Sequence, residues 1–129
     1  MQIHVLIVDD SPAMRNFIRR VLDLSGLEVG KCLEASNGEE ALRVLEDNWV
    51  DAVLTDINMP DINGLELISF VRRNAAYRTI PMLIISTEGS ERDREKGLEL
   101  GADAYLVKPF DPEALRRTAK ELLEKARGE

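Results

Sequence analysis

Short apolar segments alternate with longer stretches of helical periodicity along this chain. Residues 4–8, 52–55, 82–86 and 104–107 are nearly continuous apolar runs, which are typical of strands buried on both faces. One more strand, the second in chain order, is predicted at residues 29–35, before a turn signal. The pattern therefore predicts five strands separated by four long connections, with a further stretch after the last strand.

A helix is predicted after each strand, mostly from apolar residues at three- and four-residue spacing. Ser11 and Pro12 suit the N-cap and first turn of the first helix, which Gly26 ends. The fourth helix, at about residues 90–100, is mostly polar, and the fifth runs from residue 112 to about 127. The residues expected to face inward are Met14, Phe17, Ile18, Val21, Leu22, Ala41, Leu42, Leu45, Leu65, Ile68, Val71, Leu115, Ala119, Leu122 and Leu123.

This alternation predicts an α/β fold with a parallel sheet covered by helices on both faces. The chain of 129 residues is too short for an eight-fold barrel, which needs about 250 residues. A doubly wound five-stranded parallel sheet with the flavodoxin-like order 2-1-3-4-5 is the expected solution. We expect one domain over residues 1–129, because this length supports a single core.

Composition narrows the classes of partner and compartment. A formal charge of −7 and an isoelectric point near 4.8 argue against binding to nucleic acid or an anionic membrane. The single cysteine, Cys32, excludes an intramolecular disulfide and is expected to be a small packed residue. No apolar run approaches about 18 residues and no basic leader opens the chain, so we expect a cytoplasmic protein. We also expect it to be a monomer. Trp49 is expected to pack over the end of the second helix.

Charged residues follow three of the predicted strands. Asp9 and Asp10 follow the first strand, Asp56 the third and Lys108 the fifth. The carboxyl ends of parallel strands share one edge of the sheet, so these side chains should converge there. Clustered carboxylates raise one another's pKa unless a cation lies between them, and their hard oxygens suit Mg²⁺. The sequence therefore predicts an Mg²⁺-dependent site that handles phosphate.

Four motifs in this order resemble the receiver domain of two-component response regulators, over essentially the whole chain. Each motif lies at the end of a predicted strand, and together they are most similar to the single-domain chemotaxis regulators of the CheY-like type. The motifs are Ile7-Val8-Asp9-Asp10-Ser11, Thr55-Asp56-Ile57-Asn58-Met59-Pro60-Asp61-Ile62-Asn63-Gly64, Ile85-Ser86-Thr87 and Lys108-Pro109-Phe110.

The resemblance implies a role for each residue of the acidic site. Asp56 is the implied phosphoacceptor, a carboxylate nucleophile that takes a phosphoryl group from a phosphohistidine. Asp9 and Asp10 are the implied Mg²⁺-binding pair, with Asp10 as the direct ligand and Asp9 acting through water. Asn58 is expected to bind the metal through its backbone carbonyl. Asp56 is also an expected metal ligand.

The resemblance implies that further residues stabilise the phosphoryl group or change conformation when it is present. Lys108 would pair with one phosphoryl oxygen, aimed by a cis bond to Pro109. The Ser86 hydroxyl and a backbone N–H near Thr87 would bind others, so Asp56, Lys108 and Ser86 form the expected catalytic set. Tyr105 occupies the aromatic switch position, whose ring moves when Ser86 turns toward phosphate.

Two functions of this site remain open. The first is a signalling switch that receives phosphate from a sensor histidine kinase and binds an effector, such as a flagellar motor switch component. The second is a phosphorelay intermediate that passes phosphate to a histidine phosphotransfer protein. Asn58 resembles the chemotaxis form and favours the first function. Either protein is a phosphoacceptor with slow self-catalysed chemistry and not a turnover enzyme. An acid-phosphatase-like hydrolase is disfavoured, because Asp9-Asp10 lacks the Asp-x-Asp spacing.

Overall fold

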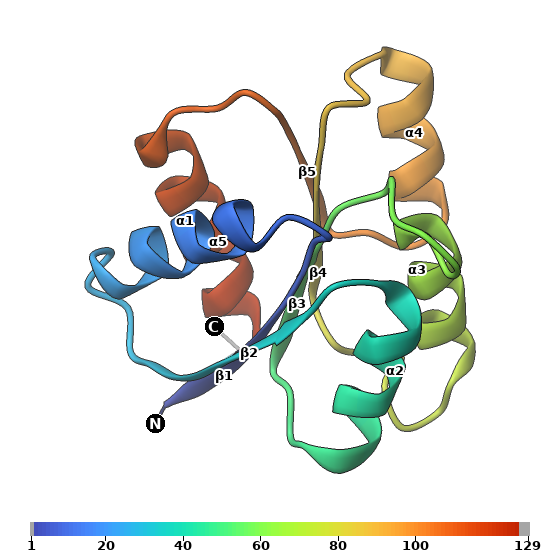
Figure 1. The fold of residues 1–129 in the computed structure, drawn as a ribbon, viewed down its shortest axis with the longest axis horizontal. Coiled ribbons are helices and arrows are strands. Elements are labelled where there is room, and N and C mark those ends of the chain that lie inside the picture. Colours follow the sequence, from blue (N-terminus) through green and yellow to red (C-terminus); the bar gives the residue numbers. More distant parts are fainter. Residues whose placement is uncertain (1, 127–129) are drawn as a thin grey trace.

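Five parallel strands form one sheet in the order β2-β1-β3-β4-β5, as the computed structural model of residues 2–126 shows (Figure 1). The strands are β1 (Ile3–Val8), β2 (Val29–Ala35), β3 (Ala52–Thr55), β4 (Met82–Ser86) and β5 (Ala104–Val107). The helices are α1 (Pro12–Asp23), α2 (Gly38–Asp47), α3 (Gly64–Arg73), α4 (Glu91–Glu99) and α5 (Pro112–Ala126). The expected flavodoxin-like fold is confirmed.

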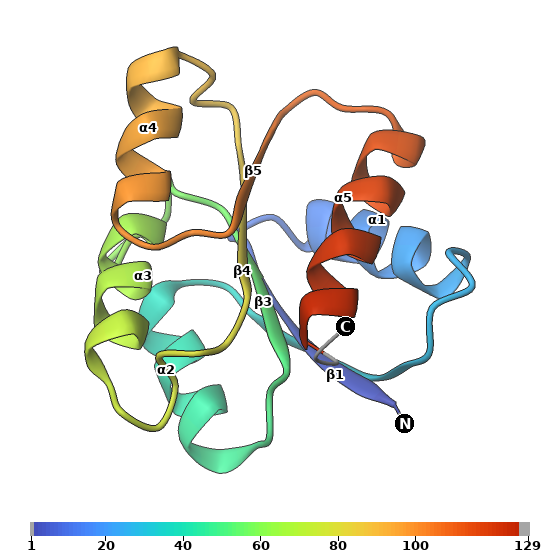
Figure 2. The ribbon, with the colours of Figure 1, turned by 180° about the vertical axis from the view of Figure 1, so that it is seen from behind.

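Helices cover both faces of the sheet. Figures 1 and 2 show α1 and α5 on one face and α2, α3 and α4 on the other. Each face has its own apolar core, because β1, β3 and β4 are buried on both sides. Leu6, Val53 and Ile84 point to the α2–α3 side, whereas Ile7 and Leu54 point to the α1–α5 side.

The helix boundaries differ slightly from the sequence-based expectation. The last helical residue of α1 is Asp23, and Leu24 caps it, so Gly26 lies in the following turn with a φ of +83°. Along α3, Leu67 is fully buried although the pattern did not single it out, and Leu65 is half-buried. The last residues expected in the fifth helix, beyond 126, lie outside the described part of the chain.

Helix α4 is the most polar helix and lies against the sheet through a glycine. Gly97 is its only buried residue, and a Cβ atom added there would lie 2.6 Å from Ile84 and 3.3 Å from the Tyr105 ring. By contrast, α5 buries Leu115, Ala119, Leu122 and Leu123, all of which were expected to face inward. Few apolar contacts therefore hold α4 in place.

Arg72, at the end of α3, forms hydrogen bonds with the loops at the amino edge of the sheet. The Arg72 guanidinium donates hydrogen bonds to the backbone carbonyls of Gly101, Arg78 and Ile80, and to the Asp103 carboxylate at 3.0 Å. Asp103 also accepts a bond from the Met82 backbone N–H. One side chain thus ties α3 to the starts of β4 and β5.

The prediction for Trp49 was wrong. Trp49 is 76% exposed, and its indole N–H donates to the Asp51 carboxylate at 2.7 Å. Asp51 also accepts a bond from the His4 backbone N–H, so the ring is held at the surface instead of packing over α2. Cys32 is half-buried in β2, as expected of a packed residue. Within residues 2–126, no helix has the length and apolarity needed to cross a membrane.

Candidate functional site

Three carboxylates meet at the carboxyl edge of the sheet. Asp9 and Asp10 follow β1, Asp56 follows β3, and one oxygen from each lies within 4.8 Å of the others. Asp9 and Asp56 are buried, whereas Asp10 is exposed to solvent. The convergence expected from the strand ends is therefore present.

Lys108 bridges two of these carboxylates from the end of β5. Its ammonium lies 2.9 Å from Asp9 and 3.3 Å from Asp56, and the peptide bond to Pro109 is cis, as expected. Burial alone would lower the pKa of Lys108. The hydrogen bond to Asp9 and the charges of Asp56 and Asp9 outweigh burial, so this pKa is raised and the side chain stays charged.

Asp56 is held in a partly desolvated position. Its Oδ1 accepts a bond from the Ile57 backbone N–H at 2.7 Å, and its Oδ2 faces Lys108. Burial raises the pKa of Asp56, Lys108 and the Ile57 bond oppose that rise, and Asp9 adds to it. The sequence suggested mutual repulsion as the cause, but desolvation is larger. The folded protein therefore disfavours the ionised form that a nucleophile needs, and a bound cation would relieve this penalty.

A close backbone approach shapes the loop after Asp56. Gly64 lies so near that an added Cβ atom would be 2.0 Å from the Asp56 carbonyl oxygen. The Gly64 N–H donates to the Ile57 carbonyl at 2.9 Å, and the adjacent Asn63 caps α3 together with Glu66. Only glycine fits here without moving the backbone that carries Asp56.

Glu88 connects three of the expected site residues, and the sequence pattern did not reveal it. Its carboxylate accepts a bond from the Asn58 side-chain amide at 2.9 Å. Its backbone N–H donates to the Ser86 hydroxyl at 3.1 Å, and its carbonyl accepts a bond from the Tyr105 hydroxyl. Tyr105 is buried, and this burial raises the pKa of its phenol. Thr87, between Ser86 and Glu88, is exposed. The loop after β4 therefore couples the acidic site to the expected switch position.

Arg15 is a second residue that the sequence pattern missed. Its guanidinium donates to the Asp9 backbone carbonyl at 2.7 Å and pairs with Glu34 of β2 at 2.9 Å. Glu34 also pairs with Arg19, one helical turn later, at 3.2 Å. The segment carrying Asp9 is thus supported from α1, which no local sequence signal indicated.

The donors present fit a divalent cation with hard ligands. Carboxylate oxygens of Asp9, Asp10 and Asp56 lie close enough to share one ion, and oxygen ligands are what Mg²⁺ prefers. The Asn58 side chain is directed to Glu88, which is compatible with the expectation that only its backbone carbonyl would bind metal. The cluster could hold Mg²⁺, and the ligand assignments remain predictions.

Comparison with known proteins identifies relatives over nearly the full chain. Residues 5–120 match the family described as response regulator receiver domain. A chemotaxis protein CheY homolog of Campylobacter jejuni is 38% identical over 97% of this chain and 95% of its own. Chemotaxis protein CheY1 of Helicobacter pylori is 40% identical over 92% and 95%. The structure of chemotaxis response regulator CheY4 of Vibrio cholerae superposes with a TM-score of 0.85 at 34% identity, covering 95% of this chain and 99% of that one.

Proposed function

The chain belongs to the family of response regulator receiver domains, and from this premise we propose that Asp56 accepts a phosphoryl group in an Mg²⁺-dependent reaction. The observation that carries the proposal is the convergence of Asp9, Asp10, Asp56 and Lys108 at one edge of the sheet. Residues 1–129 act as one receiver domain in a cytoplasmic, monomeric protein of a two-component system. Its role is that of a signalling switch and not of a turnover enzyme.

The acidic residues would hold the metal. Asp10 would bind it directly, Asp9 would bind it through water, and Asp56 and the Asn58 backbone carbonyl would complete the protein ligands. Bound Mg²⁺ supplies positive charge to the phosphoryl oxygens during transfer. Support comes from the three carboxylate oxygens within 4.8 Å of one another.

Asp56 would then act as the nucleophile. One of its carboxylate oxygens attacks the phosphorus of a phosphohistidine on a sensor histidine kinase, the O–P bond forms and the N–P bond breaks. The imidazole nitrogen leaves with the electron pair and takes a proton. Lys108 stabilises one phosphoryl oxygen as a point charge, and the Ser86 hydroxyl and Thr87 backbone N–H stabilise others. The raised pKa of Lys108 supports its role as a permanent cation.

The loop after β4 would transmit the effect of phosphorylation to the rest of the protein. Turning Ser86 toward phosphate breaks its bond with the Glu88 N–H, and Glu88 also holds the Tyr105 hydroxyl. Movement of that loop therefore changes the restraint on Tyr105 and on α4, which few contacts hold. The face made by α4, β5 and α5 then shifts between two populations with different affinity for an effector.

The effector we favour is a flagellar motor switch component, because relatives of nearly the same length are named chemotaxis proteins. The alternative is a phosphorelay intermediate that passes phosphate to a histidine phosphotransfer protein. A pull-down with motor proteins and a transfer assay with a phosphotransfer protein separate the two roles. Phosphorylation-dependent retention on the motor protein supports the switch, whereas rapid transfer to histidine supports the relay.

The chemistry is tested by intact mass after incubation with acetyl phosphate, with and without Mg²⁺. We expect one phosphoryl adduct that requires Mg²⁺ and is absent from Asp56→Asn. Lys108→Ala should keep Mg²⁺ binding and lose most of the phosphorylation-induced change at Tyr105. An adduct that persists in Asp56→Asn would contradict the assigned acceptor, and loss of metal binding in Lys108→Ala would contradict the assigned roles.

A further inference from the structure

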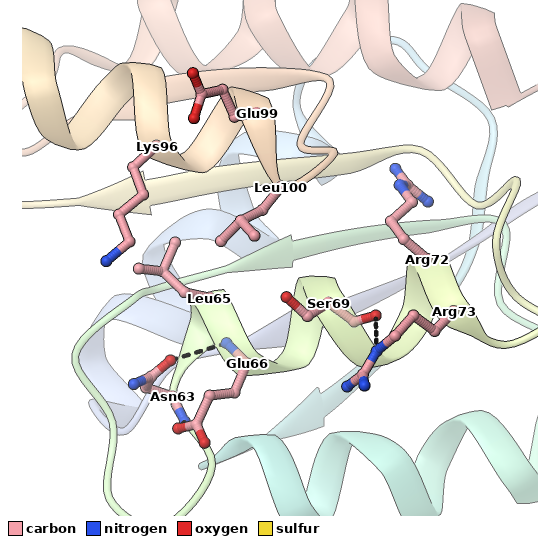
Figure 3. Close-up of a pocket in the computed structure, with 9 residues that line it drawn as sticks. All are labelled: Asn63, Leu65, Glu66, Ser69, Arg72, Arg73, Lys96, Glu99 and Leu100. Atoms are coloured by element: carbon pink, nitrogen blue, oxygen red, sulfur yellow. Dashed lines mark hydrogen bonds between the residues drawn. The ribbon is translucent and has the colours of Figure 1, made fainter.

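Among the cavities outside the acidic site, two between loops and helices on the α2–α4 side differ in charge. One, of about 770 Å³, lies between α3 and α4. In Figure 3, Leu65 and Leu100 point toward one another across it. Basic residues line this cavity together with the acidic Glu66 and Glu99. Its mixed charge does not select the sign of a partner.

The second cavity, of about 540 Å³, lies at the amino edge of the sheet and is called here the Trp49 pocket. It lies between the loop from α2 to β3 and the loop from α3 to β4, which Figure 1 shows near the bottom of the molecule. Leu45 and Tyr77 contribute apolar and aromatic walls. It is therefore at the opposite end of the strands from Asp56.

Trp49 presents a fixed aromatic surface beside this pocket. The residue is 76% exposed, and its indole N–H donates a hydrogen bond to Asp51. Asp51 is itself held by the His4 backbone N–H. The ring is thus restrained before any partner arrives, which lowers the entropic cost of binding. Tryptophan is enriched among the interface residues that dominate binding energy when a partner covers them.

The charge around the pocket is of one sign. Glu46, Asp47 and Asp51 line it, and no lysine or arginine is among its described lining residues. Glu46 and Asp47 are exposed and form no ion pair within residues 2–126. A cationic side chain entering here would meet the face of Trp49 as well as two free carboxylates, an arrangement that favours arginine or lysine.

We propose that the Trp49 pocket docks a basic segment of a partner protein. An arginine or lysine of that segment stacks on Trp49 and pairs with Glu46 and Asp47, while its apolar neighbours enter the cavity. This surface is remote from Asp56, so docking is independent of phosphorylation and does not rest on the function proposed above.

The test begins with a library of random heptapeptides selected on the unphosphorylated protein. The strongest binder is then synthesised with arginine and with citrulline, its neutral isostere. Trp49 is the only tryptophan in the chain, so its fluorescence and indole N–H resonance report this site alone. We expect basic peptides to be enriched, to perturb both Trp49 signals and to lose about five-fold in affinity with citrulline.

Two double variants with equal change in charge provide the matched control. Glu46→Gln with Asp47→Asn should weaken the arginine peptide about five-fold. Glu91→Gln with Glu95→Gln, on exposed α4, should leave its affinity unchanged, as should Asp56→Asn. Enrichment of non-basic peptides, unmoved Trp49 signals, or equal weakening in both double variants would overturn the proposal. Trp49 signals that change with protein concentration alone would overturn it too, by showing a second copy as the occupant.

Discussion

The two edges of the sheet use polar residues in opposite ways. At the carboxyl edge, Asp9 and Asp56 are buried beside one another, and burial raises the pKa of Asp56. At the amino edge, Arg72 and Asp103 satisfy backbone groups and each other. Groups at the first edge form a carboxylate cluster that could hold a metal ion, whereas groups at the second edge bond to the backbone of the fold. Stability should therefore respond differently to substitution at each edge.

The largest loss is expected from Gly64→Ala at the carboxyl edge. The new Cβ atom would lie 2.0 Å from the Asp56 carbonyl oxygen, and that backbone cannot move without displacing Asp56. We expect a loss of about 3 kcal/mol in the free energy of unfolding, measured by urea denaturation. Gly89→Ala, whose nearest neighbour is a side-chain atom of Val107 at 3.0 Å, is the control and should cost less than about 1 kcal/mol. Equal losses of stability in the two variants would show that the loop near Asp56 can move to accommodate the new Cβ atom.

Arg72→Ala should give the next largest loss, at the amino edge. It would leave three carbonyls and the Asp103 carboxylate without this donor, at a cost of about 2 kcal/mol. Its neighbour Arg73 is exposed and makes one bond, to the Ser69 carbonyl, so Arg73→Ala should cost less than about 0.5 kcal/mol. Both variants should still form the acetyl phosphate adduct. Loss of the adduct in a folded Arg72→Ala protein would contradict the separation of the two edges.

These contrasts show why the sequence predicted some features and not others. Apolar runs define strands, and the ends of parallel strands share an edge, so the convergence of Asp9, Asp56 and Lys108 followed from sequence. Glu88 was missed because its contacts depend on the path of an irregular loop. Arg15 was missed because its two partners lie on other segments, and only tertiary packing brings them together.

Trp49 illustrates the same limit for an apolar residue. A large aromatic side chain is usually packed, and no local pattern indicated that Asp51 would hold Trp49 at the surface. Its 76% exposure follows from the path of the loop after α2 and from one hydrogen bond. Burial of isolated residues next to turns is therefore the least predictable property here.

Asp56→Asn should increase the free energy of unfolding, by less than Gly64→Ala and Arg72→Ala lower it. Because the folded state raises the pKa of Asp56, the ionised carboxylate opposes folding. That penalty is full above the folded pKa and disappears as pH falls below the ordinary value of 3.8. The variant should therefore have a higher urea midpoint at neutral pH without metal, and Lys108 keeps Asp9 as its partner. Mg²⁺ should narrow the gap by stabilising the wild type. A less stable variant at neutral pH would contradict the desolvation argument.

The smallest effect is expected from Arg15→Ala, and its sign separates two roles of the arginine. If Arg15 positions the Asp9 backbone, its loss should weaken Mg²⁺ binding by about three-fold. That figure lies below the tenfold typical of outer-shell residues, because removal of a nearby positive charge favours the cation. Arg19→Ala removes a charge that also pairs with Glu34 but has no bond to Asp9, so it should leave affinity unchanged or raise it slightly. Calorimetric titration with Mg²⁺ measures both. Tighter binding in both variants would mean that Arg15 acts only through its charge and that the Asp9 segment holds its position without this hydrogen bond.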